Sequence, residues 1–101
     1  MQTTLAKPNL KPLLEIAARD TGGSRRVAQF LLSLWDGDTY RCDVQAVMYL
    51  DAPVFDDLLG LWRFLYNTNT QLSTHVSTDQ MAPIIDAWGA AFRVRPNDGD
   101  R

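Results

Sequence analysis

The sequence has few of the residues that carry catalytic or metal-binding chemistry. Its 101 residues include one cysteine, Cys42, and one histidine, His75. A single cysteine excludes an intrachain disulfide and fits a reducing compartment. Protein zinc sites use three or four ligands, so this pair does not predict one. We therefore expect no metal, no cofactor and no catalytic residue, and we expect Cys42 to be a small, partly buried apolar residue.

Long apolar runs and glycine-rich phosphate loops are also missing. No stretch approaches the roughly 18 continuous apolar residues of a membrane span, and Met1–Pro8 contains no run typical of a signal peptide. Gly22-Gly23-Ser24 matches neither the GxGxxG nor the GxxxxGKS spacing. The hydrophobic share of 46% and the charged share of 22% are ordinary for a globular protein. We expect a soluble, cytoplasmic protein without membrane contact.

Apolar residues recur at helical spacing, which predicts an all-α fold. Val27, Phe30, Leu31 and Leu34 follow the i, i+3, i+4, i+7 pattern of one helix face. We expect a compact single domain, residues 1–101, of four to five short helices with frayed ends at 1–10 and 94–101. The helices are expected near residues 12–20, 25–35, 51–66 and 79–92, with a short helix or a brief strand within 40–50. The predicted core consists of Phe30, Leu31, Leu34, Leu58, Leu61, Leu65, Ile85 and Trp88.

Local signals predict where several helices begin and end. Gly22 and Gly23 can adopt the left-handed geometry that ends a helix, and Ser24 is then the expected N-cap of the next one. Asp43 and Asp51 are expected caps of their own helices, and Gly37 is an expected C-cap. Residues 67–77 predict a polar connection. Residues 77–80 match a capping box, but Pro83 conflicts with it, so the last helix is expected to begin within 79–83.

The charges are unevenly distributed although the net charge is only −2. Residues 1–35 hold five basic and two acidic side chains, whereas residues 36–57 hold six acidic side chains and Arg41. Either the acidic segment docks on a basic partner, or the two segments pair with each other in the fold. The carboxylate pairs Asp36/Asp38 and Asp56/Asp57 are explained by a turn and a helix start, and they do not predict hydrolytic chemistry.

Arg25 and Arg26 stand at the start of a predicted helix, where cations oppose the helix dipole. They are therefore candidate anion-binding residues. One alternative function is a helix-turn-helix nucleic-acid binder built from residues 12–35, with these arginines heading the recognition helix. Gly23 at the turn position that normally holds a buried apolar residue, and the acidic overall charge, argue against it. We expect no direct contact with nucleic acid.

The run Gly23-Ser24-Arg25-Arg26-Val27-Ala28-Gln29-Phe30-Leu31-Leu32, with Trp35 and Trp88 beyond it, resembles small proteins of proteobacterial prophages and integrative elements. Such elements carry anti-CRISPR inhibitors of type I surveillance complexes. The resemblance covers residues 12–92, and its motifs are structural. The sequence departs from the pattern at Leu34, where a second tryptophan is expected, and at residues 73–77, where a glycine-rich loop is expected.

The resemblance implies a non-enzymatic inhibitor in the bacterial cytoplasm that docks on a type I CRISPR surveillance complex and blocks its access to target DNA. Basic subunits that bind guide and target are the expected partners. An acidic surface is expected to contact them by charge complementarity. The candidate partner-binding residues are Asp36, Asp38, Tyr40, Asp43, Asp51, Asp56 and Asp57. A general interaction or accessory protein of a mobile element is the second alternative, and the oligomeric state is left open.

Overall fold

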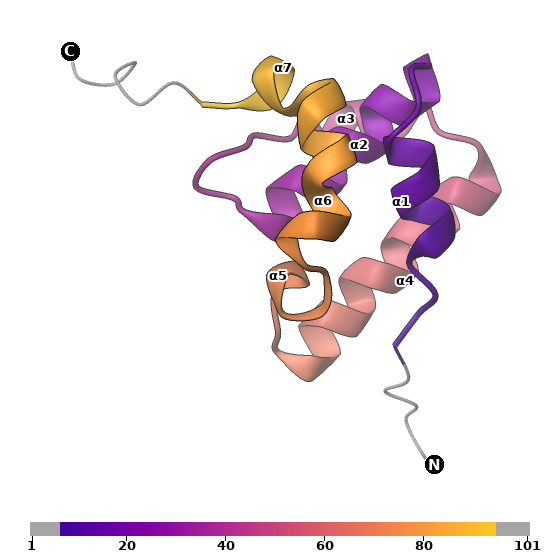
Figure 1. The fold of residues 1–101 in the computed structure, drawn as a ribbon. Coiled ribbons are helices and arrows are strands. Elements are labelled where there is room, and N and C mark those ends of the chain that lie inside the picture. The colour runs from indigo at the N-terminus through magenta and orange to yellow at the C-terminus, as the bar shows by residue number, and fades with distance from the viewer. Residues whose placement is uncertain (1–6, 95–101) are drawn as a thin grey trace.

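The structure is a computed structural model that describes residues 7–94, and its regular elements are helices (Figure 1). They are α1 (Lys11–Ala17), α2 (Gly22–Trp35), α3 (Val44–Val47), α4 (Ala52–Thr68), α5 (Leu72–His75), α6 (Thr78–Ile84), the π-helical segment η1 (Ile85–Gly89) and α7 (Ala90–Phe92). Within residues 7–94, extended pairing is limited to one antiparallel bridge between Tyr40 and Arg93. The predicted all-α class is confirmed, and residues 44–47 form the short helix rather than a strand.

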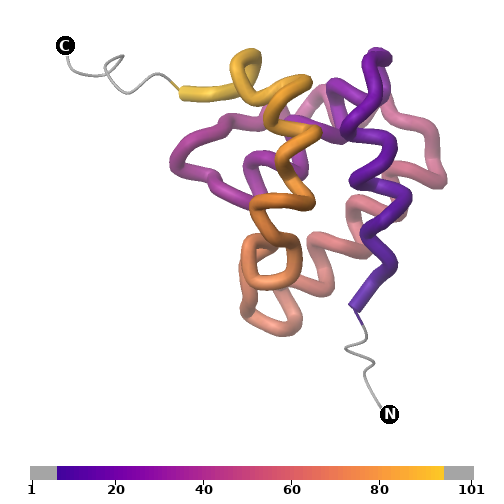
Figure 2. The backbone as a smooth tube through the Cα atoms, viewed as in Figure 1, coloured from indigo at the N-terminus to yellow at the C-terminus, as the bar shows by residue number. Residues whose placement is uncertain are grey.

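Helix α2 forms the centre of the fold. All six residues from Val27 to Leu32 are buried, which is more than one complete helical turn. Helices α1, α3, α5 and the π-helical segment η1 all pack on α2, while α1 and α6 lie side by side across the front of the molecule (Figure 2). Residues 27–32 of α2 therefore belong to the core, and the exposed residues of this helix are Gly22 and Arg25, in its first turn.

The start of α2 differs from the prediction. The N-cap is Thr21, whose Oγ1 accepts a hydrogen bond from the Ser24 backbone N–H at 3.0 Å, and the helix begins at Gly22. Ser24 is buried inside the first turn, with its hydroxyl 2.8 Å from that of Thr21. No glycine in residues 7–94 has a positive φ, and the left-handed residue is instead Asn69, at the end of α4 with φ 55°. The hydroxyl of Thr21 thus supplies the cap that we assigned to Ser24.

Asp43 and Asp51 both occupy the N-cap positions that the sequence predicts. Asp43 Oδ1 accepts from the Gln45 backbone N–H at 3.1 Å, whereas the Asp51 side chain makes no capping hydrogen bond. At the end of α2, the C-cap is Asp36 rather than Gly37. Its carboxylate accepts from the Thr39 hydroxyl at 2.7 Å and closes the turn.

The connection at 67–77 is not the polar loop that we expected. It contains the short helix α5, and Leu72 and Val76 are buried in the core. His75 Nε2 lies 2.8 Å from the Thr70 hydroxyl, and its ring meets Phe64 edge-on at 5.1 Å. Two apolar residues among nine polar ones are sufficient to anchor this segment, because they lie four residues apart and face the same side.

The last helix begins at Thr78, earlier than the predicted range of 79–83. The capping box is present in full: Ser77 Oγ accepts from the Gln80 backbone N–H at 3.1 Å, and Gln80 Oε1 accepts from the Ser77 backbone N–H at 2.9 Å. Pro83 lies inside α6, near its end. Proline cannot donate to the carbonyl four residues earlier, and the π-helical segment η1 starts two residues later.

Most of the predicted core is confirmed, with three corrections. Leu34, Ile85 and Trp88 are half-buried and pack against the core rather than forming its centre. The buried set also includes residues that we did not predict, namely Leu10, Leu13, Ala17, Val27, Ala28, Leu32, Tyr40, Val47, Leu72, Val76, Met81, Ile84 and Phe92.

Part of the chain ends that we expected to be frayed is held in place, namely residues 7–10 and 94. Leu10 is buried, and the Val94 N–H donates to the Thr39 carbonyl at 2.7 Å. The rest, 1–6 and 95–101, lies outside the described residues.

Candidate anion-binding pocket

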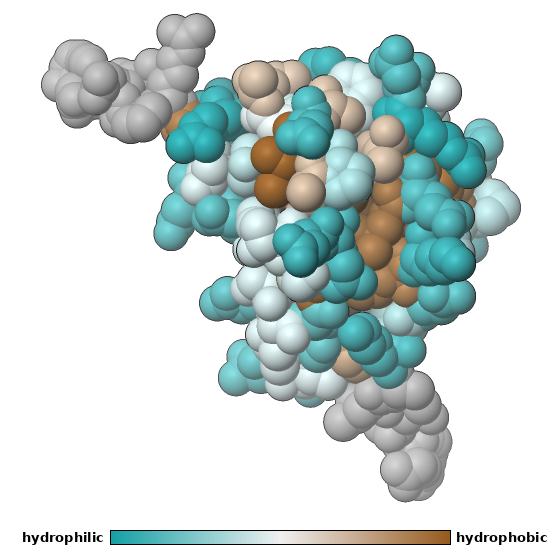
Figure 3. Space-filling model, viewed as in Figure 1, coloured by the Kyte–Doolittle hydropathy of each residue, from teal (hydrophilic) through white to brown (hydrophobic). Residues whose placement is uncertain are grey.

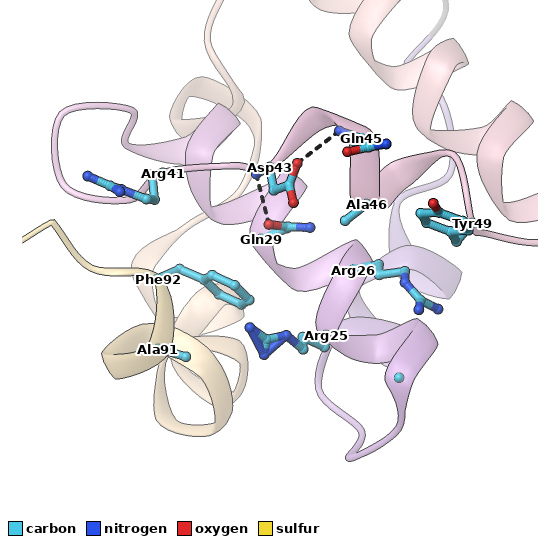
Figure 4. Close-up of a pocket in the computed structure, with 11 residues that line it drawn as sticks. Arg25, Arg26, Gln29, Arg41, Asp43, Gln45, Ala46, Tyr49, Ala91 and Phe92 are labelled. Carbon is cyan, nitrogen blue, oxygen red and sulfur yellow. Dashed lines mark hydrogen bonds between the residues drawn. The ribbon is translucent and has the colours of Figure 1, made fainter.

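A pocket of about 490 Å³ lies between the first half of α2, α3 and the end of α7 (Figure 4). Three arginines from two separate segments line it: Arg25 and Arg26 from α2, and Arg41 from the segment before α3. The remaining lining residues are Gly22, Gln29, Asp43, Gln45, Ala46, Tyr49, Ala91 and Phe92. Guanidinium groups dominate its charge, since Asp43 is the one acidic residue among those that line it.

Aromatic rings hold two of the three arginines. The guanidinium of Arg25 lies 4.9 Å from the centre of the Phe92 ring, and that of Arg26 lies 5.6 Å from the centre of the Tyr49 ring. A guanidinium stacked on a ring loses little of its capacity to donate hydrogen bonds in its own plane. These contacts therefore restrict the two side chains and leave their N–H groups available to a ligand.

The end of the described chain positions the third arginine. The Arg41 backbone N–H donates to the Phe92 carbonyl at 3.0 Å, next to the hydrogen bond from Val94 to Thr39. This short antiparallel contact brings Arg41 and Phe92 to the same pocket although they are 51 residues apart in the sequence. The pocket thus depends on tertiary contacts, and no local motif encodes it.

Gln29 and Asp43 form the polar wall of the pocket. Gln29 is 4% exposed, and its Oε1 accepts from the Asp43 backbone N–H at 2.9 Å. The amide group of Gln29 lies beside the Asp43 side chain in the pocket (Figure 4). The Asp43 carboxylate is engaged as the cap of α3. Gln29 therefore adds a neutral amide to the arginine-lined pocket.

The electrostatics of the pocket favour an anion. Gly22 and Arg25 belong to the beginning of α2, where the helix dipole is positive, and the first turn of α2 contains no acidic residue. Free backbone N–H groups at a helix start are themselves anion donors. Arginine recognises carboxylate and phosphate through paired N–H···O hydrogen bonds. The arrangement can hold a phosphate or carboxylate group.

Cys42 lies beside this pocket but has the properties of a structural residue. Burial raises the pKa of its thiol above the ordinary value, and the Asp43 carboxylate raises the pKa further, while a hydrogen bond with Ser33 partly lowers it. A raised pKa disfavours the thiolate, which is the nucleophilic form. In addition, residues 7–94 contain no group of three or more His, Cys, Asp or Glu side chains placed to bind a metal.

The structure separates the predicted acidic surface into parts. Asp36 and Asp38 belong to the loop at the left of Figure 1, whereas Asp56 and Asp57 lie in the first half of α4, at the right. The other two carboxylates lie among arginines: Asp43 in the pocket described above, and Asp51 in a neighbouring hollow with Arg19 and Arg26. The acidic residues of 36–57 therefore do not form one continuous face.

Tyr40 is a correction to the predicted partner-binding set. It is 5% exposed, because the 39–41 segment pairs with the end of the chain and turns the phenol ring toward Gly89. A buried ring of this kind is part of the core and is not available to a partner. The tyrosine that does reach the candidate pocket is Tyr49, which is 66% exposed.

The sequence identifies Arg25 and Arg26 as candidate anion-binding residues, but not the residues that complete their pocket. Tyr49, Arg41, Gln29 and Phe92 were not assigned to an anion site, and their spacing along the chain contains no recognisable motif. One signal was present in the sequence: Gln29 lies four residues beyond Arg25, so both belong to the same side of a helix.

The fold and the pocket define this chain as a small all-α protein with an arginine-lined surface pocket. Residues 7–89 match the family of unknown function DUF7673, and the chain belongs to this family. The match extends from the segment before α1 to the end of the π-helical segment η1, so it includes Arg25, Arg26 and Arg41. No curated protein and no solved structure matches the chain. No helix in residues 7–94 has the length and apolar character needed to cross a membrane.

Proposed function

We propose that this chain is a non-enzymatic interaction protein that receives an anionic group of its partner in the arginine-lined pocket. The observation that carries the proposal is the stacking of Arg25 on Phe92 and of Arg26 on Tyr49 around one cavity. Two cations near the start of a helix cost roughly 0.3–1 kcal/mol each when exposed. An anion bound between them removes this cost and gains charge-assisted hydrogen bonds.

The first test measures anion binding directly. Inorganic phosphate and a short acidic peptide are titrated into the protein, and chemical shifts of the arginine side chains and of α2 are followed by NMR. We expect saturable shifts confined to the pocket, and at least tenfold weaker binding in the Arg25→Ala/Arg26→Ala double variant. Lys11→Ala is the control, because Lys11 is an exposed basic residue of α1 outside the pocket. Equal binding by the double variant and the control would contradict the proposal.

Arg25→Lys and Arg26→Lys give a sharper version of this test. Lysine keeps the positive charge but lacks the planar fork that stacks on a ring and donates two parallel hydrogen bonds. We expect several-fold weaker binding in each lysine variant, with folding unchanged by circular dichroism. Full retention of affinity would mean that charge alone suffices and that the stacked geometry has no role.

For the identity of the partner, we propose a type I CRISPR surveillance complex, as the resemblance to prophage and integrative-element proteins implies. The divided acidic residues give little support to docking through one acidic face. The pocket offers a different contact, since such a complex also presents carboxylates and guide phosphates. Purified complex is incubated with the protein, and binding of target DNA is measured by gel shift.

We expect the wild-type protein to block DNA binding and the Arg25→Ala/Arg26→Ala variant to block it weakly. Asp36→Lys/Asp38→Lys tests the acidic contact in parallel, at two carboxylates outside the pocket. If the acidic variant loses inhibition and the arginine variant keeps it, the acidic segment is the docking surface and the pocket is not. If the protein neither co-elutes with the complex nor inhibits it, the proposed partner is wrong.

A further inference from the structure

Helix α4 presents a row of large apolar side chains to solvent. Leu59, Trp62 and Tyr66 are 43%, 49% and 77% exposed, and Phe55 is half-buried at the start of the same row. These four residues follow i, i+4, i+7, i+11 spacing, so they form one face of the helix, here called the α4 stripe. Contiguous exposed apolar side chains, with tryptophan and tyrosine among them, are typical of protein interaction surfaces.

The α4 stripe has hollows on its surface that the side chains of another helix can fill. Trp62 meets the buried Phe30 ring edge-on at 5.5 Å, which fixes the indole although half of it is exposed. A hollow of about 460 Å³ lies on one side of Trp62, lined by Leu59, Arg63 and Tyr66. A second hollow, of about 550 Å³, adds Leu34 and Leu65 on the other side. Helices pack by placing ridges of side chains into such grooves.

We propose that the occupant of the α4 stripe is the α4 helix of a second copy of this chain, packed antiparallel across a two-fold axis. The charges beside the stripe support this choice. Asp56 and Arg63 are both exposed, and they lie seven residues apart, close to two full helical turns, so they border the same edge of the stripe. An antiparallel partner reverses their order, and each Asp56 then faces Arg63 of the other copy.

The positions of the charges and of the apolar residues agree with one symmetry axis. The midpoint between Asp56 and Arg63 falls between residues 59 and 60, and the midpoint of Phe55 and Tyr66 falls between 60 and 61. These midpoints differ by one residue, or about 1.5 Å along the helix. A two-fold interface must be complementary to itself. The α4 stripe meets this condition in both its apolar and its charged residues.

A charge-exchange experiment tests the proposal. Sedimentation is measured from about 5 μM to about 500 μM, a range that brackets micromolar affinity. We expect wild type to dimerise in this range. Arg63→Asp places like charges opposite each other at two symmetric sites, and the dimer dissociation constant should rise about tenfold or more. The Asp56→Arg/Arg63→Asp double variant restores both pairs with exchanged signs, and we expect dimerisation to recover.

Two further variants keep the outcome clear. Tyr66→Lys puts a charge into the stripe at its most exposed residue and should abolish the dimer, while Glu15→Arg changes an exposed charge on α1 and should leave it intact. Circular dichroism checks that every variant folds. A wild-type protein that stays monomeric throughout, or a double variant that dimerises no better than Arg63→Asp alone, would overturn the proposal.

Discussion

At the residue scale, the arginine pocket shows how aromatic neighbours can turn charges that oppose a helix dipole into a candidate anion-binding site. From the sequence, Arg25 and Arg26 are two unfavourable charges near the start of a helix. In the structure each has an aromatic partner, Phe92 for Arg25 and Tyr49 for Arg26. The sequence could identify the arginines because their conflict with the helix dipole is local. It could not identify the rings, because Phe92 reaches Arg25 only through the tertiary fold.

His75 is expected to act in folding and not in partner binding. Its Nε2 shares a 2.8 Å hydrogen bond with the Thr70 hydroxyl in a partly buried setting, and a bond of this kind contributes about 0.5–1.5 kcal/mol. We expect His75→Ala to lower the free energy of unfolding by about 1 kcal/mol in urea denaturation, with anion affinity unchanged within about threefold. A loss of affinity in a folded His75→Ala protein would place the histidine in the site.

Cys42 gives a prediction about pH. Burial raises the pKa of the thiol in the folded state, so the folded protein holds this proton more tightly than the unfolded chain does. Its contribution to stability is complete below the ordinary thiol pKa of about 8.5 and is lost as the pH rises through the folded-state value. We expect wild type to lose stability above the ordinary thiol pKa of about 8.5 more steeply than Cys42→Ala. Parallel curves for the two proteins would contradict this assignment.

At the element scale, the fold shows which helix signals can be trusted when two of them conflict. The capping box at 77–80 and Pro83 give opposite predictions, and we expected the proline to prevail. The structure contains both the capping box and a proline inside the helix. The two are compatible because the cap acts at the first turn and Pro83 comes only near the end of α6. Similarly, α5 was missed because a four-residue helix has too few positions for a periodic pattern. Its formation depends on the burial of Leu72 and Val76.

The capping box predicts a measurable loss. Ser77 Oγ satisfies the Gln80 backbone N–H, and Ser77→Ala leaves that donor without its protein partner. We expect the free energy of unfolding to fall by about 1 kcal/mol, the usual effect of removing a serine cap. Ser73→Ala is a suitable control, because Ser73 is exposed and its one side-chain contact is long, at 3.4 Å. Equal stability of the two variants would mean that α6 does not need this cap.

At the scale of the whole molecule, the all-α class and most of the central core were predictable, because helical periodicity records which side of each helix is buried. The surfaces were less predictable. The acidic residues of 36–57 lie on different elements, and Asp43 and Asp51 join arginines from other segments. The α4 stripe was missed because helical periodicity does not distinguish an apolar side chain in the core from an exposed one such as Trp62, which is half exposed. The visible face of the molecule is mostly hydrophilic, with apolar surface along the seam between α1 and α6 (Figure 3).

The two proposed surfaces should respond differently to salt. The arginine pocket binds through exposed charges, which are screened over about 10 Å at 0.1 M ionic strength. The α4 stripe is mainly apolar and has only two symmetric ion pairs. We expect a rise from about 50 mM to about 500 mM NaCl to weaken phosphate binding by tenfold or more and to change the dimer constant by less than about threefold. Calorimetry and sedimentation measure the two effects separately.

The π-helical segment η1, Ile85–Gly89, sets a limit on how the length of this chain can vary. A π turn contains more residues than an α turn, and Phe92 lies three residues beyond this segment. Because a π turn absorbs one extra residue, deleting one residue here, such as Ala87, would let the helix continue in α geometry with Phe92 on the same side of the helix axis. Deleting a residue in α7, such as Ala91, would instead rotate Phe92 by about 100° around the axis. The ring would then leave Arg25, and the 92–94 segment would lose its pairing with 39–41. The chain can therefore shorten by one residue within η1 but not between η1 and Phe92.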